Sequence, residues 1–364
     1  MIDLVQHSIA VIKANQHPNG AYVASPNFGT YAYSWLRDGS FIAHAMDRVG
    51  EHESAAAFHR WVGGVLLHYD DKLAALTARR LAGEEIHLAE QMHCRFTLEG
   101  RESSADWTNF QLDGYGTWLW ALEDHIRRNG DTTLFAELRP QVARLVAYLR
   151  AFWDTPCFDC WEEFGDKVHT ATLAAIMAGL QAAARLDPAL ADETPQRIRA
   201  FVFEHCVVAG HLAKFVGSDL VDASLLGVAV PYALLGADHA VLRATVQKIE
   251  RDLLHHGVRR YVEDSYYGGS EWLLLTAWLG WVHAESGDVA RARPLLEWVA
   301  AQADAHGDMP EQVCDAPLRP DFVQPWVDRW GPVAKPLLWS HAMYLILNET
   351  LARVRRESAR RASP

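Results

Sequence analysis

Apolar residues recur at steps of three and four along most of this chain, the spacing of helices with one buried face. In the segment 133–153, Leu134, Leu138, Val142 and Leu145 follow this spacing, and arginines stand between them. No region of comparable length shows the alternating apolar and polar pattern that predicts strands. The pattern predicts helices over 2–14, 38–49, 52–80, 113–128, 133–153, 169–187, 193–208, 222–235, 238–254, 272–285, 288–304 and 336–357.

Every second predicted helix is apolar nearly all round, as in EWLLLTAWLGWVHA and HTATLAAIMAGLQAAARL, whereas its neighbours, such as HAVLRATVQKIERDLLHH, keep a polar face. Apolarity on every side indicates burial on every side. Six buried helices alternating with six half-exposed helices predict an all-α (α/α)6 barrel of about twelve helices. Because no Pro/Gly/Ser linker divides the chain, we expect residues 1–364 to form a single catalytic domain.

The loops between these helices are unequal in length. Short turns leave each inner helix, and long loops of about 13 residues or more lead into the next one. Long loops in a compact domain are usually functional. These six all open at one end of the barrel, above the N-termini of the inner helices, and we expect the functional site there. They contain WLRD, DWTNFQ, CWEEFG, SDLVDAS, RRYVEDSYYGGSEW and MPEQV.

Charge and composition exclude several classes of function. The chain carries 34 Lys and Arg against 46 Asp and Glu, and its basic residues gather only at Arg355, Arg356, Arg360 and Arg361, so we expect no nucleic-acid partner. No apolar run approaches the roughly 20 residues that span a bilayer, and the first residues do not resemble a signal peptide. We therefore expect no membrane association and a cytoplasmic location.

Cysteines and histidines give no metal or cofactor signature. Five cysteines are an odd number, which argues against a disulfide framework. Cys157 and Cys160 form a CxxC without a second such pair, so we interpret them as structural. The eighteen histidines include no HExxH. We expect no catalytic metal and no cofactor.

Tryptophan is abundant in and beside the long loops. Aromatic rings alternating with carboxylates and arginines suit a sugar, which offers apolar C–H faces and a rim of hydroxyls. An alternative is that some of these rings only fill the end of the barrel. The residues concerned are Trp35, Trp107, Trp161, Trp272, Trp326 and Trp330.

Hydrolysis of a glycosidic bond requires two carboxyl groups, one protonated and one ionised. Glu162 stands among other acidic residues and between Trp161 and Phe164, surroundings that should raise its pKa and suit a general acid. Glu311 lies in the loop before the last inner helix, across the ring, where it could hold a water as general base. Read alone, either residue could equally be a solvated surface group.

Two further acidic residues have two interpretations each. Asp38 could cap the helix that follows it, or Arg37 and Asp38 together could bind sugar hydroxyls. Asp222 is interpreted in the same two ways, with helix capping favoured.

Five segments, in order, resemble glycoside hydrolase family 15, the inverting α-glucosidases of the glucoamylase type, and the resemblance spans about residues 31–347. YAYSWLRDGSF is similar to the family's Tyr…Trp-x-Arg-Asp segment, DWTNFQLDGYG to its Trp-x-x-x-Gln-x-Asp-Gly segment and CWEEFGDKVHT to the segment with the acid. RRYVEDSYYGGSEW resembles its Arg-Tyr-x-x-Asp segment, and MPEQV with PLLWSHA resembles the segment with the base.

The resemblance implies an (α/α)6 fold, no cofactor, Glu162 as general acid and Glu311 as general base. It further implies that Arg37, Asp38 and Arg260 bind the terminal glucose and that Trp35, Trp107 and Trp272 shape its pocket. The same segments lead us to expect four more residues to bind substrate: Gln111, Trp161, Glu163 and Tyr261.

The sequence departs from larger relatives in ways that bear on the substrate. Cys160 replaces a common Leu, Val262 replaces a fungal Pro, and 27 residues separate Glu311 from Trp339. From this sequence we expect neither an N-terminal β-sandwich nor a starch-binding module. We therefore expect a short gluco-oligosaccharide, preferably isomaltose or another α-1,6-linked glucoside, as in the isomaltose glucohydrolase type within the family. The alternatives are a maltose-, maltodextrin- or trehalose-hydrolysing member, a sugar epimerase, or a barrel that binds glycans without catalysis.

Overall fold

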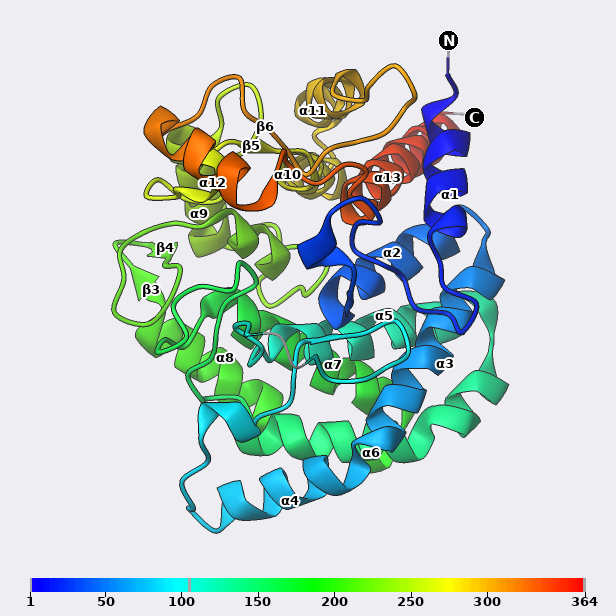
Figure 1. Ribbon diagram of the computed structural model, residues 1–364, viewed down its shortest axis with the longest axis vertical. Coiled ribbons are helices and arrows are strands. Elements are labelled where there is room, and N and C mark those ends of the chain that lie inside the picture. The colour runs from blue at the N-terminus through cyan, green and yellow to red at the C-terminus, as the bar shows by residue number, and fades with distance from the viewer. Residues whose placement is uncertain (1, 104–105, 363–364) are drawn as a thin grey trace.

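The computed structural model describes residues 2–103 and 106–362 and consists of an inner ring of helical segments surrounded by outer helices (Figure 1). Each inner segment contacts the next, and the last contacts the first, so the ring is closed. This arrangement confirms the predicted all-α (α/α)6 barrel. The inner segments are α2 (Leu36–Arg48), α5 (Asp113–Asn129), α7 (Thr170–Leu186), the 3₁₀ helix η4 (Ala223–Val228), α10 (Leu273–Glu285) and α13 (Leu338–Ala362). The outer helices are α1 (Leu4–Ala14), α3 (His52–His68), α6 (Thr132–Phe152), α8 (Thr194–His205), α9 (Ala240–Leu253) and α11 (Val289–Ala301).

The inner helices are buried over nearly their whole length, as their composition predicts. In α10 every residue from Leu273 to Ala284 is buried. The helices α5 and α7 approach closely because glycine stands where they meet. A Cβ added at Gly116 would lie 2.4 Å from the carbonyl oxygen of Ala175, and one added at Gly179 would lie 2.5 Å from that of Gly116. Any larger residue would force these helices apart.

The prediction of a helix over 222–235 is wrong beyond the first turns of that segment. Only the short η4 forms, and turns follow it. Pro231 cannot donate a helical hydrogen bond and disfavours the helical conformation of the residue before it. Gly227 is also held against the rings of Tyr232 and Trp278. This wall of the ring is therefore built of a short 3₁₀ helix that is fully buried, followed by irregular backbone in which Tyr232, Leu234 and Leu235 are buried.

The helix predicted over 52–80 is two helices, α3 and α4 (Asp70–Leu81), which meet at Tyr69. The Tyr69 backbone leaves the helical region, and its hydroxyl accepts a hydrogen bond from the backbone of Glu102 at 2.8 Å. Asp70 and Asp71 then stand in the first turn of α4, where carboxylates favour a new helix. A further helix, α12 (Val323–Trp330), lies in the long segment after Glu311 and was not predicted.

Two-residue strands form short antiparallel pairs, of which the first and third join two different long loops and the second is a hairpin. They join β1 (Ser34–Trp35) to β2 (Arg95–Phe96), β3 (Val207–Val208) to β4 (His211–Leu212), and β5 (Glu271–Trp272) to β6 (Gln312–Val313). The first pair fixes Trp35 at the start of α2, and the third fixes Trp272 opposite Gln312. The remaining 3₁₀ turns are η1 (Gly29–Tyr31), η2 (Leu88–Glu90), η3 (Pro188–Leu190), η5 (Tyr266–Gly268) and η6 (Pro320–Phe322).

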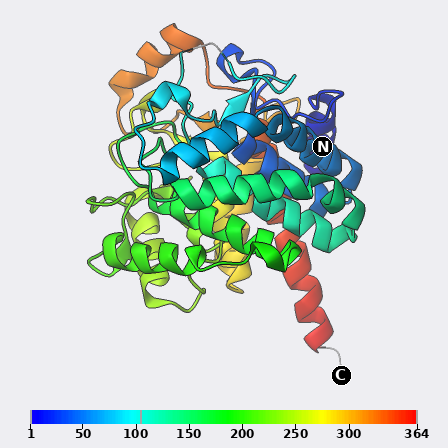
Figure 2. The ribbon, with the colours of Figure 1, turned by 90° about the horizontal axis from the view of Figure 1, so that it is seen from below.

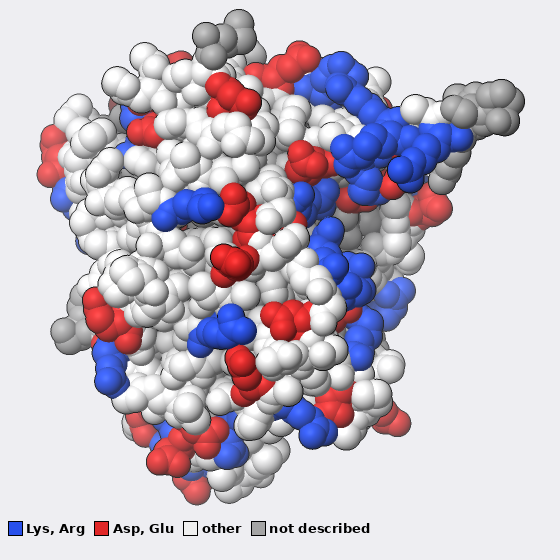
Figure 3. Space-filling view, turned by 90° about the vertical axis from the view of Figure 1, so that its right-hand side faces the viewer, with Lys and Arg blue, Asp and Glu red and all other residues white. Residues whose placement is uncertain are grey.

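The surface carries mixed charges. On the face in Figure 3, basic and acidic side chains alternate, and the densest basic group lies at the protruding end of α13, where Arg355, Arg356 and Arg360 are exposed. Figure 2 shows this end of α13 extending beyond the body of the molecule. Among the described residues, no helix has the length and apolarity needed to cross a bilayer.

Candidate active site

A cavity of about 490 Å³ opens at the end of the ring where the long loops gather. Five of the six long loops contribute lining residues, and the sixth, at 209–221, lies behind the wall. Ten of the twelve residues that the sequence predicted for the site line this cavity. They are Trp35, Arg37, Asp38, Trp107, Trp161, Glu162, Glu163, Arg260, Trp272 and Glu311.

The other two predicted residues stand one contact away from the cavity. Gln111 accepts a hydrogen bond from Arg37 Nη1 at 2.8 Å, and Tyr261 donates its hydroxyl to Glu163 Oε2 at 2.5 Å. Both therefore orient a lining side chain. Neither residue is among those that line the cavity, and their predicted role as substrate contacts stays a prediction.

The segment that carries Glu162 is a tight turn with an unusual backbone. Glu162 has a φ of 69°, in the left-handed region that residues with a Cβ rarely adopt. The carbonyl of Asp159 accepts from the Glu162 N–H at 2.9 Å, and Asp159 Oδ1 accepts from the N–H groups of Trp161 and Glu163 at 3.0 and 2.9 Å. One carboxylate thus holds the turn, and the strain is offset by these bonds.

A buried ion network supports this turn from behind. Lys214 Nζ lies 3.0 Å from Asp159 Oδ2 and 2.5 Å from Asp222 Oδ2, and all three residues are buried. Asp222 also accepts from the indole of Trp161 at 3.0 Å and from the Ser224 N–H at 2.7 Å. The capping interpretation of Asp222 is therefore confirmed, and the same carboxylate also anchors Trp161.

Glu162 is half-buried, and its carboxylate accepts a hydrogen bond from the indole N–H of Trp35 at 2.7 Å. Burial raises the pKa of Glu162, while the indoles of Trp107 and Trp35 and the charge of Arg37 counteract part of the rise. The predicted direction of this pKa is confirmed. The apolar cover comes from the two tryptophans and not from Phe164, which is partly exposed and packs on Phe215.

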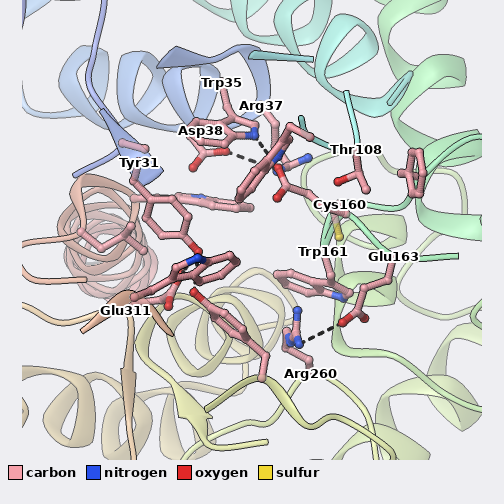
Figure 4. Close-up of a pocket in the computed structure, with 18 of the residues that line it drawn as sticks. Tyr31, Trp35, Arg37, Asp38, Thr108, Cys160, Trp161, Glu163, Arg260 and Glu311 are labelled. Carbon is pink, nitrogen blue, oxygen red and sulfur yellow. Dashed lines mark hydrogen bonds and ion pairs between the residues drawn. The ribbon is translucent and has the colours of Figure 1, made fainter. Parts of the chain in front are cut away.

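Glu311 lies on the opposite side of the cavity from the segment with Cys160, Trp161 and Glu163 (Figure 4). Its N–H donates to the carbonyl of Ala334 at 2.9 Å, which fixes it beside the start of β6. Glu311 Oε1 accepts from the Tyr31 hydroxyl at 2.9 Å, and Oε2 from Gln312 Nε2 at 3.3 Å. Burial raises its pKa to about 7 despite these donors.

Asp38 points into the cavity from the first turn of α2 (Figure 4). It does not cap the helix, because α2 begins at Leu36 and its N-cap residue is Trp35. The capping interpretation of Asp38 is therefore wrong. Burial raises its pKa to about 6, and Arg37 counteracts this rise. Arg37 donates through Nη1 to Gln111 at 2.8 Å and to Asp113 at 2.9 Å. Asp38 Oδ2 has no hydrogen-bond partner among the described residues, so it offers a polar atom to a ligand.

Arg260 stands at the cavity wall among aromatic rings. Its Nε donates to Asp264 Oδ2 at 2.7 Å, and Nη2 lies 3.4 Å from Glu163 Oε1. Its guanidinium carbon lies 5.2–5.6 Å from the ring centroids of Trp161, Tyr261, Tyr266 and Trp272. These contacts hold the guanidinium in place at the cavity wall.

The mouth of the cavity is walled by α12. Trp330 stacks on Trp107 with ring centroids 5.9 Å apart and an interplanar angle of 28°, and Arg329 lies over both Trp326 and Trp330. The Trp326 indole donates to the carbonyl of Ser265 at 2.9 Å. These bonds connect the long segment after Glu311 to two other loops, so the wall is a packed structure.

Sequence reasoning missed several residues that line the cavity. Tyr31 and Tyr266 share a hydrogen bond of 2.8 Å between their hydroxyls beside Glu311. Cys160 and Trp339 also line it. The two tyrosines lie in motif segments that were singled out, so an aromatic hydroxyl next to a motif was the available signal. Among the described residues, no group of three possible metal ligands lines this cavity.

Comparison with known proteins adds independent findings. The model of glycosyl hydrolases family 15 matches residues 2–309. The chain is 44% identical over 362 residues to the isomaltose glucohydrolase of Kribbella flavida, which covers 96% of this chain and 92% of that protein. A glycosidase solved in complex with glucose is 44% identical with a TM-score of 0.92, and 96% of each chain is covered. A bacterial glucoamylase solved with acarbose shares the fold at 20% identity, with a TM-score of 0.77, over 96% of this chain and 55% of that one.

Proposed function

The chain belongs to glycosyl hydrolase family 15, and from this premise we propose that it is an inverting exo-acting α-glucosidase that releases β-glucose from the non-reducing end of short gluco-oligosaccharides. The family and the resemblance noted in the sequence agree. The proposed substrate is isomaltose or another short α-1,6-linked glucoside.

The observation that carries this proposal is a pair of carboxyl groups, half-buried Glu162 and buried Glu311, which come from separate loops to line one cavity. Burial raises the pKa of each, yet their donors differ: Glu162 receives an indole, whereas Glu311 receives a hydroxyl and an amide. Two carboxyl groups with separate surroundings can hold opposite protonation states at one pH, which acid and base catalysis in a glycosidase require.

The proposed reaction is a single displacement. Protonated Glu162 gives its proton to the glycosidic oxygen as the bond to the anomeric carbon breaks. Ionised Glu311 accepts a proton from a water that attacks the anomeric carbon on the opposite face, so the configuration inverts. Arg37, Asp38 and Arg260 would bind the glucose hydroxyls, and Trp35, Trp107 and Trp272 would cover its apolar faces.

The mechanism is tested by following hydrolysis of isomaltose by proton NMR. We expect β-glucose to appear first, and kcat to fall by roughly a thousandfold or more in Glu162→Gln and in Glu311→Gln. Glu123→Gln is the matched control, because Glu123 is a buried carboxyl that does not line the cavity. Initial release of α-glucose, or near wild-type turnover in Glu311→Gln, would contradict the mechanism. The two carboxyl groups should also lie about 6.5–9.5 Å apart in a crystal structure.

Support for the α-1,6 preference comes from the similarity to the isomaltose glucohydrolase of Kribbella flavida and from the aromatic wall at the cavity mouth. A packed wall leaves room for few sugars beyond the cleaved bond. The test compares kcat/KM for isomaltose, maltose, trehalose and a long maltodextrin. The highest value for isomaltose supports the proposal, and a higher value for any other refutes the linkage or length preference. Release of no glucose from any of them, with binding retained, would favour a non-catalytic glycan-binding barrel, and 2-epimerised sugar would favour an epimerase.

We also propose that residues 1–364 act as one catalytic domain. A closed ring in which the last inner helix packs on the first supports this proposal. Differential scanning calorimetry should then give one cooperative transition, whereas two separable transitions would refute it. The expected location in the cytoplasm stays a prediction.

A further inference from the structure

At the opposite end of the barrel from the cavity, three buried side chains meet: Asp47 of α2, His59 of α3 and His125 of α5. One possible ligand atom from each lies within 4.8 Å of the other two. We propose that this cluster binds a divalent transition metal ion of the zinc type, and that the ion stabilises the barrel and takes no part in catalysis.

The cluster is remote from the catalytic cavity. Asp38 lines the cavity at the first turn of α2, and Asp47 stands in its last turn. Nine residues of helix separate them by roughly 13 Å along the axis. His125 is likewise close to the end of α5, which finishes at Asn129. The C-terminal ends of two inner helices therefore converge here, and their partial negative charge favours a bound cation.

The ring of His59 is the strongest sign of a missing partner. The residue is fully buried, and neither ring nitrogen has a hydrogen-bond partner among the described residues. His125 Nε2 also lacks one, its nearest carboxylate oxygen being Asp131 Oδ2 at 3.8 Å. Leaving such a buried polar atom unsatisfied is costly, and native proteins rarely do so. A single coordinated ion would partner one nitrogen of each imidazole, and water could partner the second nitrogen of His59.

The remaining contacts resemble the outer support of a metal site. Asp47 accepts from Asn129 Nδ2 at 2.9 Å, and His52 Nδ1 lies 3.0 Å from its Oδ1. Such bonds fix the orientation of metal ligands in known sites. His125 Nδ1 lies 2.9 Å from both Asp47 oxygens, so these two proposed ligands also contact each other directly.

The donor set selects the class of ion. Two imidazole nitrogens and one carboxylate suit Zn²⁺, Co²⁺ or Ni²⁺, whereas Mg²⁺ and Ca²⁺ prefer sites made of oxygen atoms. His52, which is half exposed beside Asp47, or a water would complete a four-coordinate site. The simpler alternative is a buried Asp–His pair with water beside His59, and the experiment below separates the two.

The test uses the full chain, purified without a metal-affinity column. Metal content is measured after dialysis, and the protein is then stripped with a chelator and titrated separately with Zn²⁺ and Mg²⁺. We expect about one equivalent of Zn²⁺ to be retained. Zn²⁺ at a hundred times its Kd should raise the Tm of the stripped protein by roughly 3 °C, a value scaled to a chain of this length. Mg²⁺ should not raise it.

Two variants give the proposal its controls. His59→Gln should abolish both the retained zinc and the Tm shift, while hydrolytic activity at 25 °C, measured in parallel, reports that the chain is folded. His44→Gln is the matched control, because His44 is buried at the same end of α2 and also has one unpartnered nitrogen, but belongs to no three-ligand group. It should bind zinc like the wild type.

A wild-type protein that retains less than about a tenth of an equivalent and shows no Zn²⁺-dependent shift overturns the proposal. An unchanged shift in His59→Gln also overturns it. If His59→Gln does not fold, Co²⁺ substitution of the wild type decides, since a tetrahedral Co²⁺ absorption spectrum supports the site and its absence refutes it. Because metal content and Tm are read independently of hydrolysis, failure here leaves the proposed function untouched.

Discussion

The hydroxyl of Tyr31 should set the lower pH limit of catalysis. It donates to Glu311 Oε1 at 2.9 Å and lowers the pKa of that carboxyl against the rise that burial causes. The ring itself is packed on Phe28 and Trp35, with centroids 4.7 and 5.7 Å away. Tyr31→Phe therefore removes one hydrogen bond to the proposed base and keeps the ring in place.

The size of the effect follows from the bond. A hydrogen bond to a charged group contributes about 1.5–3 kcal/mol, and a pKa unit corresponds to about 1.4 kcal/mol. Loss of the donor should raise the pKa of Glu311 from about 7 by about 1–2 units. Because the base works only when ionised, and its ionised fraction falls as pH drops below the pKa, kcat/KM at pH 6 should fall by about 10–100-fold. Above the new pKa the loss should be small.

The assay is a profile of kcat/KM for the best glucoside between pH 4 and 10. The control is Tyr33→Phe, because the Tyr33 hydroxyl accepts a hydrogen bond from the Ser103 hydroxyl at 3.1 Å and Tyr33 does not line the cavity. That variant should keep the wild-type profile. A Tyr31→Phe profile that drops equally at every pH, or keeps its acidic limb in place, would show that the hydroxyl does not control the ionisation of Glu311.

Three further predictions concern stability and specificity. Lys214→Met should lower the free energy of unfolding by about 3–5 kcal/mol, because it leaves Asp159 and Asp222 buried without their cation. Urea denaturation measures this, and Lys167→Met, which breaks an exposed pair with Asp166, should change it by less than about 1 kcal/mol. Glu311→Gln should stabilise the protein at pH 8 by up to about 3 kcal/mol, since ionising a buried carboxyl with a pKa of about 7 against 4.5 destabilises the fold as pH rises between these values. The gain should vanish at pH 4.5. If the variant and the wild type have the same urea midpoint at pH 8 as well as at pH 4.5, the prediction is contradicted. Trp330→Ala should lower kcat/KM for isomaltose by about 2–10-fold through KM, because it removes the ring stacked on Trp107; an unchanged KM would show that α12 does not contact the substrate.

The fold could be predicted from the sequence where helix polarity carries the information. Inner and outer helices differ in how far around the helix apolar residues extend, and this difference alone indicates two rings. The method failed at 222–235, where the segment is as apolar as an inner helix but Pro231 ends the helical run. An apolar composition indicates that a segment is buried, and a buried irregular segment has the same composition as a buried helix.

The site could be predicted where motifs fall in long loops, because loop ends that converge on one side of a ring bring distant residues together. What could not be predicted are contacts that depend on side-chain direction. Gln111 and Tyr261 orient other residues without lining the cavity, and Lys214 supports Asp159 from a loop that reaches no lining position. Spacing along the chain gives the loop on which a residue lies and does not give the direction of its side chain.

Two opposing effects set the pKa values of the carboxyl groups in the cavity: the helix N-termini lower them, and burial raises them. The inner helices present their N-termini to this end of the barrel, and each such end stabilises a nearby carboxylate by about 0.3–1 kcal/mol. The rise in the pKa of Glu311 to about 7 corresponds to about 3 kcal/mol in the opposite direction. Burial therefore outweighs the helix ends, and Glu311, Glu162 and Asp38 all have raised pKa values. Carboxyl groups that titrate nearer to neutral pH can exchange protons with substrate and water there, so the same burial that weakens the fold favours acid and base catalysis.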